Sequence, residues 1–140
     1  MKAKVVYFSL TGNTKKVAEA IAGAAGCRAE SAEKAEVNEV IDVLFIGAAV
    51  YATHDHNVNP EIRNFINRVK NGNVKKVVVF GTYAFGSSIE KLAQIARDKG
   101  LSVAEENFTC KGKFFFFNRK APGAEDLEKA RAFAKRITNT

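Results

Sequence analysis

Continuous apolar runs alternate with segments of helical periodicity along the chain, and this alternation restricts the fold more than any other feature. The apolar runs at residues 4–8, 43–50 and 77–80 contain few polar residues, as expected of strands that are covered on both faces. Weaker strands are expected at residues 27–31 and 102–110, where small or charged residues interrupt the apolar pattern and suit the edges of a sheet.

Four segments between and after these runs have apolar residues at helical spacing. One follows Thr14, and a second has Asn59 as a candidate N-cap with Pro60 at its first position. A third runs from two serines at 87–88 to Gly100, and the last follows Pro122. The resulting order, βαβαβαβαβα, predicts one α/β domain over residues 1–140, a doubly wound parallel sheet of five strands with helices on both faces.

The composition is basic, with a formal net charge of +7, and residues 111–140 hold eight Lys and Arg against three Asp and Glu. A basic surface favours acidic protein partners or anionic ligands. Nucleic acid is not expected, because no basic-aromatic or helix-turn-helix motif accompanies the charge. We expect no contact with a membrane and a cytoplasmic location, because the sequence lacks an apolar run of spanning length and a signal peptide.

Cysteine and histidine give weaker signals. Cys27 and Cys110 fall on strands predicted at opposite edges of the sheet, so they are predicted to be free thiols, because a disulfide needs Cα atoms within about 7 Å. No metal is expected, since His54 and His56 alone make a poor ligand set. Two interpretations of these histidines stay open: a pH-responsive pair and part of a solvated loop. The four phenylalanines at 114–117 are interpreted as a strand, with an exposed docking patch as the alternative.

Three loops follow confident strands, and ligands of parallel sheets bind at the carboxyl ends of strands. The first loop, FSLTGNT, has four neutral donors, Ser9, Thr11, Asn13 and Thr14, around Gly12. It opens a helix, whose N-terminal N–H groups and dipole attract anions. The loop has neither GxxxxGK[ST] nor GxGxxG, so it predicts a phosphomonoester that is held and never transferred. A polar helix cap is the alternative.

The stretch SLTGNT resembles the phosphate-binding loop of flavodoxins, [ST]xTGxT. AVYAT and FGTYAFGS are similar to the two flavodoxin loops that contact the isoalloxazine ring, and the likeness extends over the whole chain. Flavodoxins are the type example of strand order 2-1-3-4-5 with flavin mononucleotide (FMN) at the point where strand order reverses. The resemblance therefore implies this order and FMN as the cofactor.

The resemblance also implies a set of cofactor contacts. The first loop would hold the phosphate, Tyr51 and Phe85 would lie against the two faces of the flavin, and the loop after residue 80 would offer backbone groups to its pyrimidine edge. Ala52 departs from the glycine that short-chain relatives often have. The implied residues are Ser9, Leu10, Thr11, Gly12, Asn13, Thr14, Val50, Tyr51, Ala52, Thr53, Gly81, Thr82, Tyr83, Ala84, Phe85 and Gly86.

The leading functional hypothesis is an FMN-binding electron-transfer protein that carries one or two electrons between redox partners. It needs no catalytic side chain, because the flavin supplies the chemistry. The basic segment 111–120 would steer an acidic redox protein, and a monomer or weak dimer is expected. The alternatives are a small FMN-dependent NAD(P)H:quinone-type reductase, disfavoured by the short chain, and a flavodoxin-like module that has lost FMN.

Overall fold

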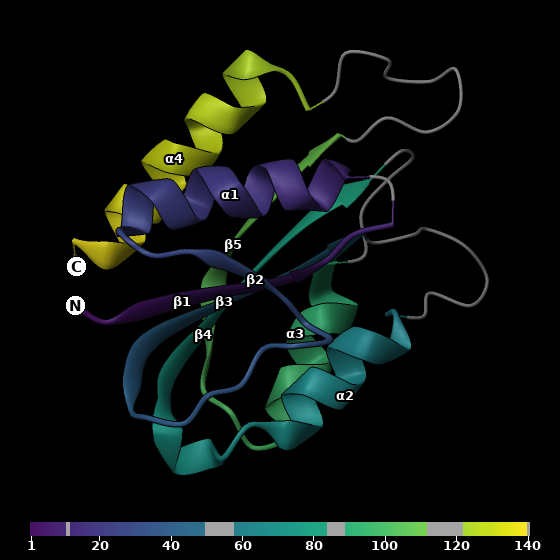
Figure 1. Ribbon diagram of the computed structural model, residues 1–140, viewed down its shortest axis with the longest axis vertical. Helices are drawn as coiled ribbons and strands as arrows, with labels where there is room; N and C mark the ends of the chain where they lie inside the picture. The colour runs from purple at the N-terminus through teal and green to yellow at the C-terminus, as the bar shows by residue number, and fades with distance from the viewer. Residues whose placement is uncertain (11, 50–57, 84–88, 112–121, 140) are drawn as a thin grey trace.

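A five-stranded parallel sheet with helices on both faces forms the body of the protein (Figure 1). The computed structural model describes residues 1–10, 12–49, 58–83, 89–111 and 122–139. In chain order the elements are β1 (Ala3–Phe8), α1 (Asn13–Ala25), β2 (Ala29–Ser31), β3 (Ile41–Ala49), α2 (Pro60–Arg68), the 3-10 turn η1 (Asn71–Asn73), β4 (Val74–Tyr83), α3 (Ile89–Asp98), β5 (Val103–Lys111) and α4 (Ala124–Thr138).

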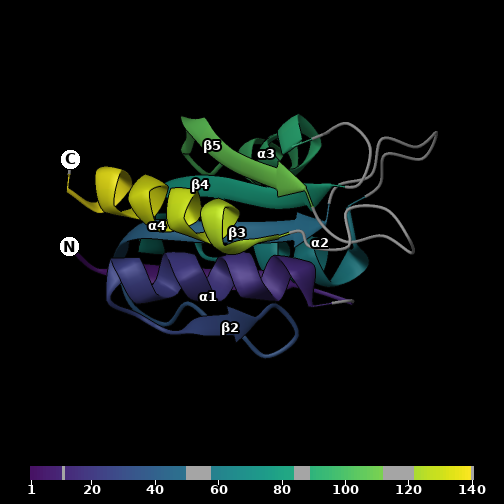
Figure 2. The same ribbon diagram turned by 90° about the horizontal axis from the view of Figure 1, so that it is seen from above.

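The strand order is β2-β1-β3-β4-β5, which confirms the predicted 2-1-3-4-5 topology. From β1 the chain first adds β2 on one side, and β3 then pairs with the other side of β1. This reversal places α1 and α4 on one face of the sheet and α2 and α3 on the other (Figure 2). The order of strands thus reverses beside the carboxyl end of β1.

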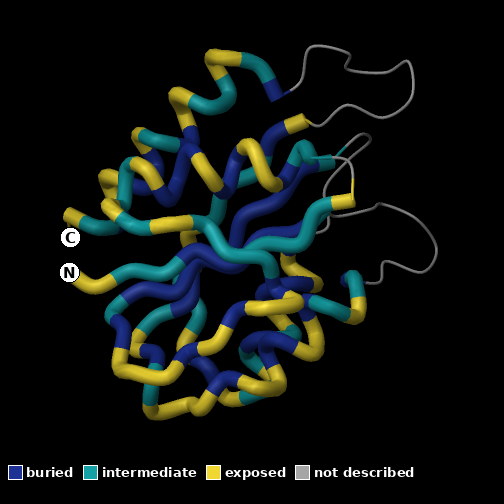
Figure 3. The backbone as a smooth tube through the Cα atoms, in the orientation of Figure 1, coloured by how far each residue is buried: buried dark blue, intermediate teal, exposed yellow. Residues whose placement is uncertain are grey.

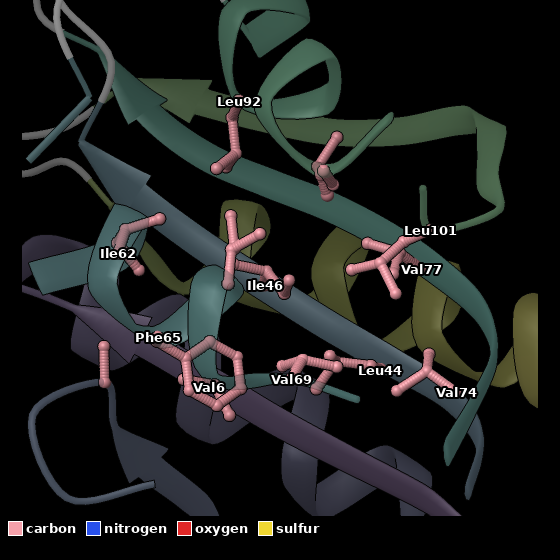
Figure 4. Close-up of a cluster of buried hydrophobic side chains, with 14 of the residues drawn as sticks. Val6, Leu44, Ile46, Ile62, Phe65, Val69, Val74, Val77, Leu92 and Leu101 are labelled. Carbon is pink, nitrogen blue, oxygen red and sulfur yellow. The ribbon is translucent and has the colours of Figure 1, made fainter. Parts of the chain in front are cut away.

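Alternate residues of the central strands supply two separate cores, which Figure 3 shows as the buried centre of the fold. Val6, Leu44 and Ile46 face α2 and α3 and belong to the cluster drawn in Figure 4. Their neighbours Val5 and Phe45 belong to the cluster under α1 and α4. Because both faces are covered, the strands have the near-continuous apolar sequences from which they were predicted.

The helix ends follow the local sequence signals. The Asn59 side chain accepts a hydrogen bond from the Glu61 N–H at 2.9 Å, with Pro60 at the first helical position, so the predicted cap is confirmed. Gly26, with φ +76°, ends α1, and Gly100, with φ +98°, follows α3. Positive φ is easily adopted only by glycine, which makes both residues natural stops for a helix.

Several strands differ in extent from their predictions. The central strand β4 covers Val74–Tyr83, three residues more at each end than the predicted run 77–80, and the two edge strands also differ. β2 covers three residues, because the Cys27 N–H donates to the Ala22 carbonyl at 2.9 Å and residue 27 thereby completes the end of α1. β5 runs one residue further than predicted, to Lys111, and its exposed Glu105 and Glu106 are consistent with an edge. The predictions for residues 50, 87–88 and 114–117 lie outside the described residues.

The side chain of Arg68 binds the irregular stretch between β2 and β3. The Arg68 guanidinium donates to the carbonyl oxygens of Ala32 at 2.8 Å and Ala35 at 3.2 Å, and it lies 5.8 Å from the centre of the Phe65 ring. These carbonyls belong to no strand or helix, and the guanidinium satisfies them. The short edge strand β2 is therefore supported by α2 as well as by its pairing with β1.

Gly47 in β3 lies beneath the side chain of Phe80 on the neighbouring strand β4. The two residues are paired across the strands, and the Phe80 ring is fully buried. A Cβ atom placed on Gly47 would lie 2.0 Å from Cε2 and 2.2 Å from Cζ of that ring. Only glycine therefore lets the ring lie against the backbone of β3.

The beginning of β1 and the end of α4 lie at the same edge of the sheet, away from the strand arrowheads (Figure 1). The helices α1 and α4 begin toward the arrowhead side, at the carboxyl ends of the strands. The predicted ligand site and the two ends of the chain thus lie on opposite sides of the molecule.

Candidate functional site

The site begins where β1 ends and α1 starts, at the point of strand reversal. Ser9 and Leu10 follow β1, and α1 begins at Asn13 after Gly12, whose φ is +93°. The Gly12 N–H donates to the Ser9 hydroxyl oxygen at 2.9 Å. The turn is therefore closed by a neutral hydroxyl, which keeps its own proton available for donation.

The N-terminus of α1 is built differently from that of α2. Gly12, the residue at the N-cap of α1, makes no side-chain cap hydrogen bond, whereas Asn59 caps α2. The first-turn N–H groups of a helix have no partner within the helix. The N-terminus of α1 lies at the carboxyl edge of the sheet (Figures 1 and 2), where ligands of this fold class bind.

The charges in the first turns of the helices also single out α1. The other three described helices have an acidic residue in the first turn: Glu61 in α2, Glu90 in α3, and Glu125 and Asp126 in α4. The first turn of α1 has none, and Lys15 and Lys16 lie there instead. Negative charge stabilises a helix N-terminus, so an anion bound at α1 would supply the negative charge that the side chains of its first turn lack.

A buried pair of hydroxyls joins this helix to β4. Thr14 Oγ1 and Thr82 Oγ1 lie 2.8 Å apart, and the two residues are only 1% and 2% exposed. Thr82 is the penultimate residue of β4, so the pair connects the first predicted loop to the strand that leads into the third. This contact was not predicted, because the two threonines are 68 residues apart.

One of the two hydroxyl protons is not used in the hydrogen bond between Thr14 and Thr82. Two hydroxyl groups have two protons and share one hydrogen bond, and either oxygen of the pair can be the donor. When Thr82 donates, the Thr14 proton is left for an anion at the start of α1. The described loop therefore combines hydroxyl and N–H donors without a carboxylate, a set that suits a phosphate group.

The structure places the remaining predicted contacts only in part. Leu10 is 77% exposed, Gly81 is buried within β4, and Tyr83 ends that strand and packs against the core beneath α2 and α3. The other predicted contacts and the histidine pair lie outside the described residues: Thr11, Val50, Tyr51, Ala52, Thr53, His54, His56, Ala84, Phe85 and Gly86. Of the basic segment 111–120, only Lys111 is described.

Both cysteines are free, as predicted. Cys110 is buried and pairs with Thr82 across the sheet. Burial raises the pKa of the Cys110 thiol to about 12, and the negative charge of Asp126 adds to the effect. The pKa of Cys27 is also raised, first by burial and then by Glu30.

These pKa shifts predict slow and unequal alkylation. With iodoacetamide at pH 8, followed by mass spectrometry, we expect the partly exposed Cys27 to react first and Cys110 to react only after unfolding, because the thiolate is the nucleophile. Faster labelling of Cys110 in the folded protein would contradict the described burial.

Both thiols hold their protons more tightly in the folded chain, so the free energy of unfolding should decrease as the pH rises from about 9 toward 12.

Neither a metal centre nor a membrane-spanning helix is found in the described ranges. Residues 1–10, 12–49, 58–83, 89–111 and 122–139 contain no group of three or more His, Cys, Asp and Glu residues that could hold a metal ion. None of the helices in those ranges is long and apolar enough to cross a bilayer.

Comparisons with known proteins agree with this geometry. The chain is 28% identical over 152 residues to an uncharacterized protein of Methanocaldococcus jannaschii, covering 98% of both. Its fold is similar to oxidised Flavodoxin 1 of Bacillus cereus, with a TM-score of 0.74, 20% identity and coverage of 99% of this chain and 98% of that one. For two-electron reduced Megasphaera elsdenii flavodoxin the TM-score is 0.60, with 25% identity and coverage of 94% and 98%.

The family assignment rests on the sequence. The family model described as the flavodoxin domain matches residues 4–120, which include the whole predicted phosphate loop, β2 to β5 and all of β1 after its first residue. The chain therefore belongs to the flavodoxin domain family.

Proposed function

We propose that the protein binds FMN, with the phosphate at the N-terminus of α1, and carries electrons between redox proteins. The observation that carries the proposal is the first turn of α1. It has neither a side-chain cap from Gly12 nor an acidic residue, and it lies at the reversal of strand order. These features suit a bound anion, and membership of the flavodoxin domain family supports FMN as the molecule that provides it.

The chain's own groups would hold the phosphate without reacting with it. Ser9 has a hydroxyl proton to donate, and when Thr82 donates to Thr14 the Thr14 proton is directed to the phosphate. Gly12 has open space around its Cβ position, so the backbone presents no side chain to an incoming phosphate. Bound FMN would supply reversible one- and two-electron chemistry.

An electron carrier is favoured over a reductase by the extent of the match. The chain covers 98% of the Megasphaera elsdenii flavodoxin, which has been described in its two-electron reduced form. With 94% of this chain also covered, residues 1–140 hold no long insertion of the kind that would form a substrate pocket between the shared elements. The proposal therefore includes no catalytic side chain.

The first test is FMN uptake by the purified protein, followed by titration with FMN and with riboflavin. Replacing Thr11 and Thr14 together with valine should weaken FMN binding more than tenfold, because each hydrogen bond to a charged group contributes about 1.5–3 kcal/mol. Riboflavin binding should change little. The matched control is Thr138→Val, at the far end of α4.

Three results would count against the proposal. Equal FMN uptake by the Thr11→Val/Thr14→Val variant would remove the phosphate site. A parent protein that takes up no FMN would indicate a flavodoxin-like module without the cofactor. Sustained oxidation of NADH or NADPH with a quinone would assign a reductase in place of a carrier.

A further inference from the structure

A groove lies between α1 and α4, on the face of the sheet that these two helices share. The helices lie side by side in both views (Figures 1 and 2), and the hollow between them has a volume of about 490 Å³. Its apolar lining includes Ala20 and Ala24 of α1 and Leu127 of α4, which pack against the core beneath. The groove thus has an apolar floor that continues into the interior.

The rim of the groove is mainly positive. Lys16 on α1 and Arg131 and Lys135 on α4 line it, with Glu19 as the opposing charge. Arg131 is 3.1 Å from Glu128, but within the described part of the chain the Lys16 and Lys135 side chains have no ion pair. The lining therefore has three cations against one carboxylate, which attracts negative charge.

Gly23, in the interior of α1, has no evident role in the fold. A Cβ atom at this position would meet nothing within 4 Å, and its φ is not positive. Glycine inside a helix nevertheless costs about 1 kcal/mol relative to alanine. Because Gly23 lines the groove, its missing side chain keeps the hollow wide enough for an approaching backbone.

We propose that this groove docks an acidic helical segment of a partner protein, with apolar side chains on the floor and carboxylates along the rim. The elongated arrangement favours such a segment over a small anion. Arg131 and Lys135 are four residues apart, or about 6 Å along α4, and match two carboxylates one turn apart on a helix. Leu127, one turn before Arg131, offers an apolar contact in the same row. A second copy of this chain is disfavoured by its own charge of +7.

The groove begins about one helical turn from the candidate phosphate site. Lys16 is in the first turn of α1, and its N–H donates to the Gly12 carbonyl at 3.1 Å. A partner seated along the groove would therefore extend toward the carboxyl edge of the sheet. That this partner exchanges electrons rests on the proposed function, whereas the preference for an acidic segment rests only on the groove.

The proposal can be tested with a fluorescein-labelled helical peptide of about 15 residues, comparable in length to α4. It has glutamate at every fourth position, leucine beside each glutamate and alanine elsewhere; a second peptide has lysine in place of every glutamate. Fluorescence anisotropy is recorded with the full chain, both with and without added FMN. We expect the acidic peptide to bind, the basic peptide not to bind, and the affinity to fall as salt is raised.

Two variants locate the peptide. Lys16→Gln/Lys135→Gln should weaken binding about tenfold at low salt. The control Lys70→Gln/Lys91→Gln removes the same charge from exposed positions, one between α2 and η1 and one on α3, and should leave binding unchanged. Gly23→Gln should abolish binding by filling the hollow, without unfolding the protein, because glutamine is the better helix former. Ala132→Gln on the exposed surface of α4 is the control for Gly23→Gln.

The contrary outcomes are equally definite. Absence of peptide binding, equal binding of the two peptides, or equal effects of the groove variants and their controls would overturn the proposal. Self-association that Gly23→Gln abolishes, measured by analytical ultracentrifugation, would also overturn it by making a second copy the occupant. Because the titration needs no flavin, its failure is distinct from a failure to bind FMN.

Discussion

Replacing Gly47 with valine is expected to lower the free energy of unfolding by about 3 kcal/mol, as overpacking of a filled core typically does. The Cβ atom alone would lie 2.0 Å from the Phe80 ring, and that ring is fully buried in the core. Gly47→Ala should lose less, because it adds one carbon atom and not three; in both variants the lower backbone entropy of the unfolded chain offsets about 0.5–1 kcal/mol. Denaturation in urea, followed by circular dichroism, measures both variants.

A second substitution separates the clash from a general intolerance of side chains in β3. Phe80→Leu shortens the group that a Cβ atom at residue 47 would meet, so Gly47→Ala/Phe80→Leu should lose less stability than the sum of the two single variants. Gly23→Ala is the matched control, since its Cβ meets nothing within 4 Å; it should gain about 1 kcal/mol. Additive losses in the double variant would refute the described contact.

Removing either hydroxyl of the buried threonine pair should destabilise the protein by about 1–3 kcal/mol, because the remaining hydroxyl would be buried without its partner. Thr14→Val and Thr82→Val are close to isosteric, so the loss reports the hydrogen bond of 2.8 Å more than a change in packing. Thr14→Val/Thr82→Val should be more stable than the sum of the single variants predicts, since it leaves neither oxygen unpaired. Denaturant unfolding without flavin completes the cycle.

The same variants also test the proposed phosphate site. If Thr82 orients the Thr14 proton toward the phosphate, Thr82→Val should weaken FMN about tenfold, by the loss of about 1.4 kcal/mol, and leave riboflavin nearly unchanged. Thr138→Val at the end of α4 is the control. Equal losses for FMN and riboflavin would show that Thr82 acts on the flavin ring or on the fold, and not through the phosphate.

The sequence predicted the elements whose own residues determine their conformation and burial. Strands buried on both faces have continuous apolar sequences, so β1, β3 and β4 were found, and Asn59–Pro60 located the start of α2. The edge strand β2 was predicted too long, because only three-dimensional structure shows that residue 27 closes the preceding helix. Edge strands bury less surface and therefore show a weaker pattern.

The site was predictable where its residues are contiguous and not where they are brought together by folding. The loop around Gly12 was identified from its own sequence, and the start of α1 follows it as expected. The side-chain contact between Thr14 and Thr82 depends on the register of two elements 68 residues apart. Neither the groove beside Gly23 nor the Arg68 contacts has a local signal, because each combines residues of separate elements.

The placement of the chain ends has a practical consequence for attaching this protein to other molecules. The strand β1 begins and the helix α4 ends at the edge of the sheet away from the carboxyl ends of the strands. A tag, a fused enzyme or an electrode linker joined at either end would therefore lie at that edge, opposite the proposed flavin site. Such a tether would leave the proposed flavin pocket facing outward, so immobilised and fused forms suit direct measurements of electron exchange.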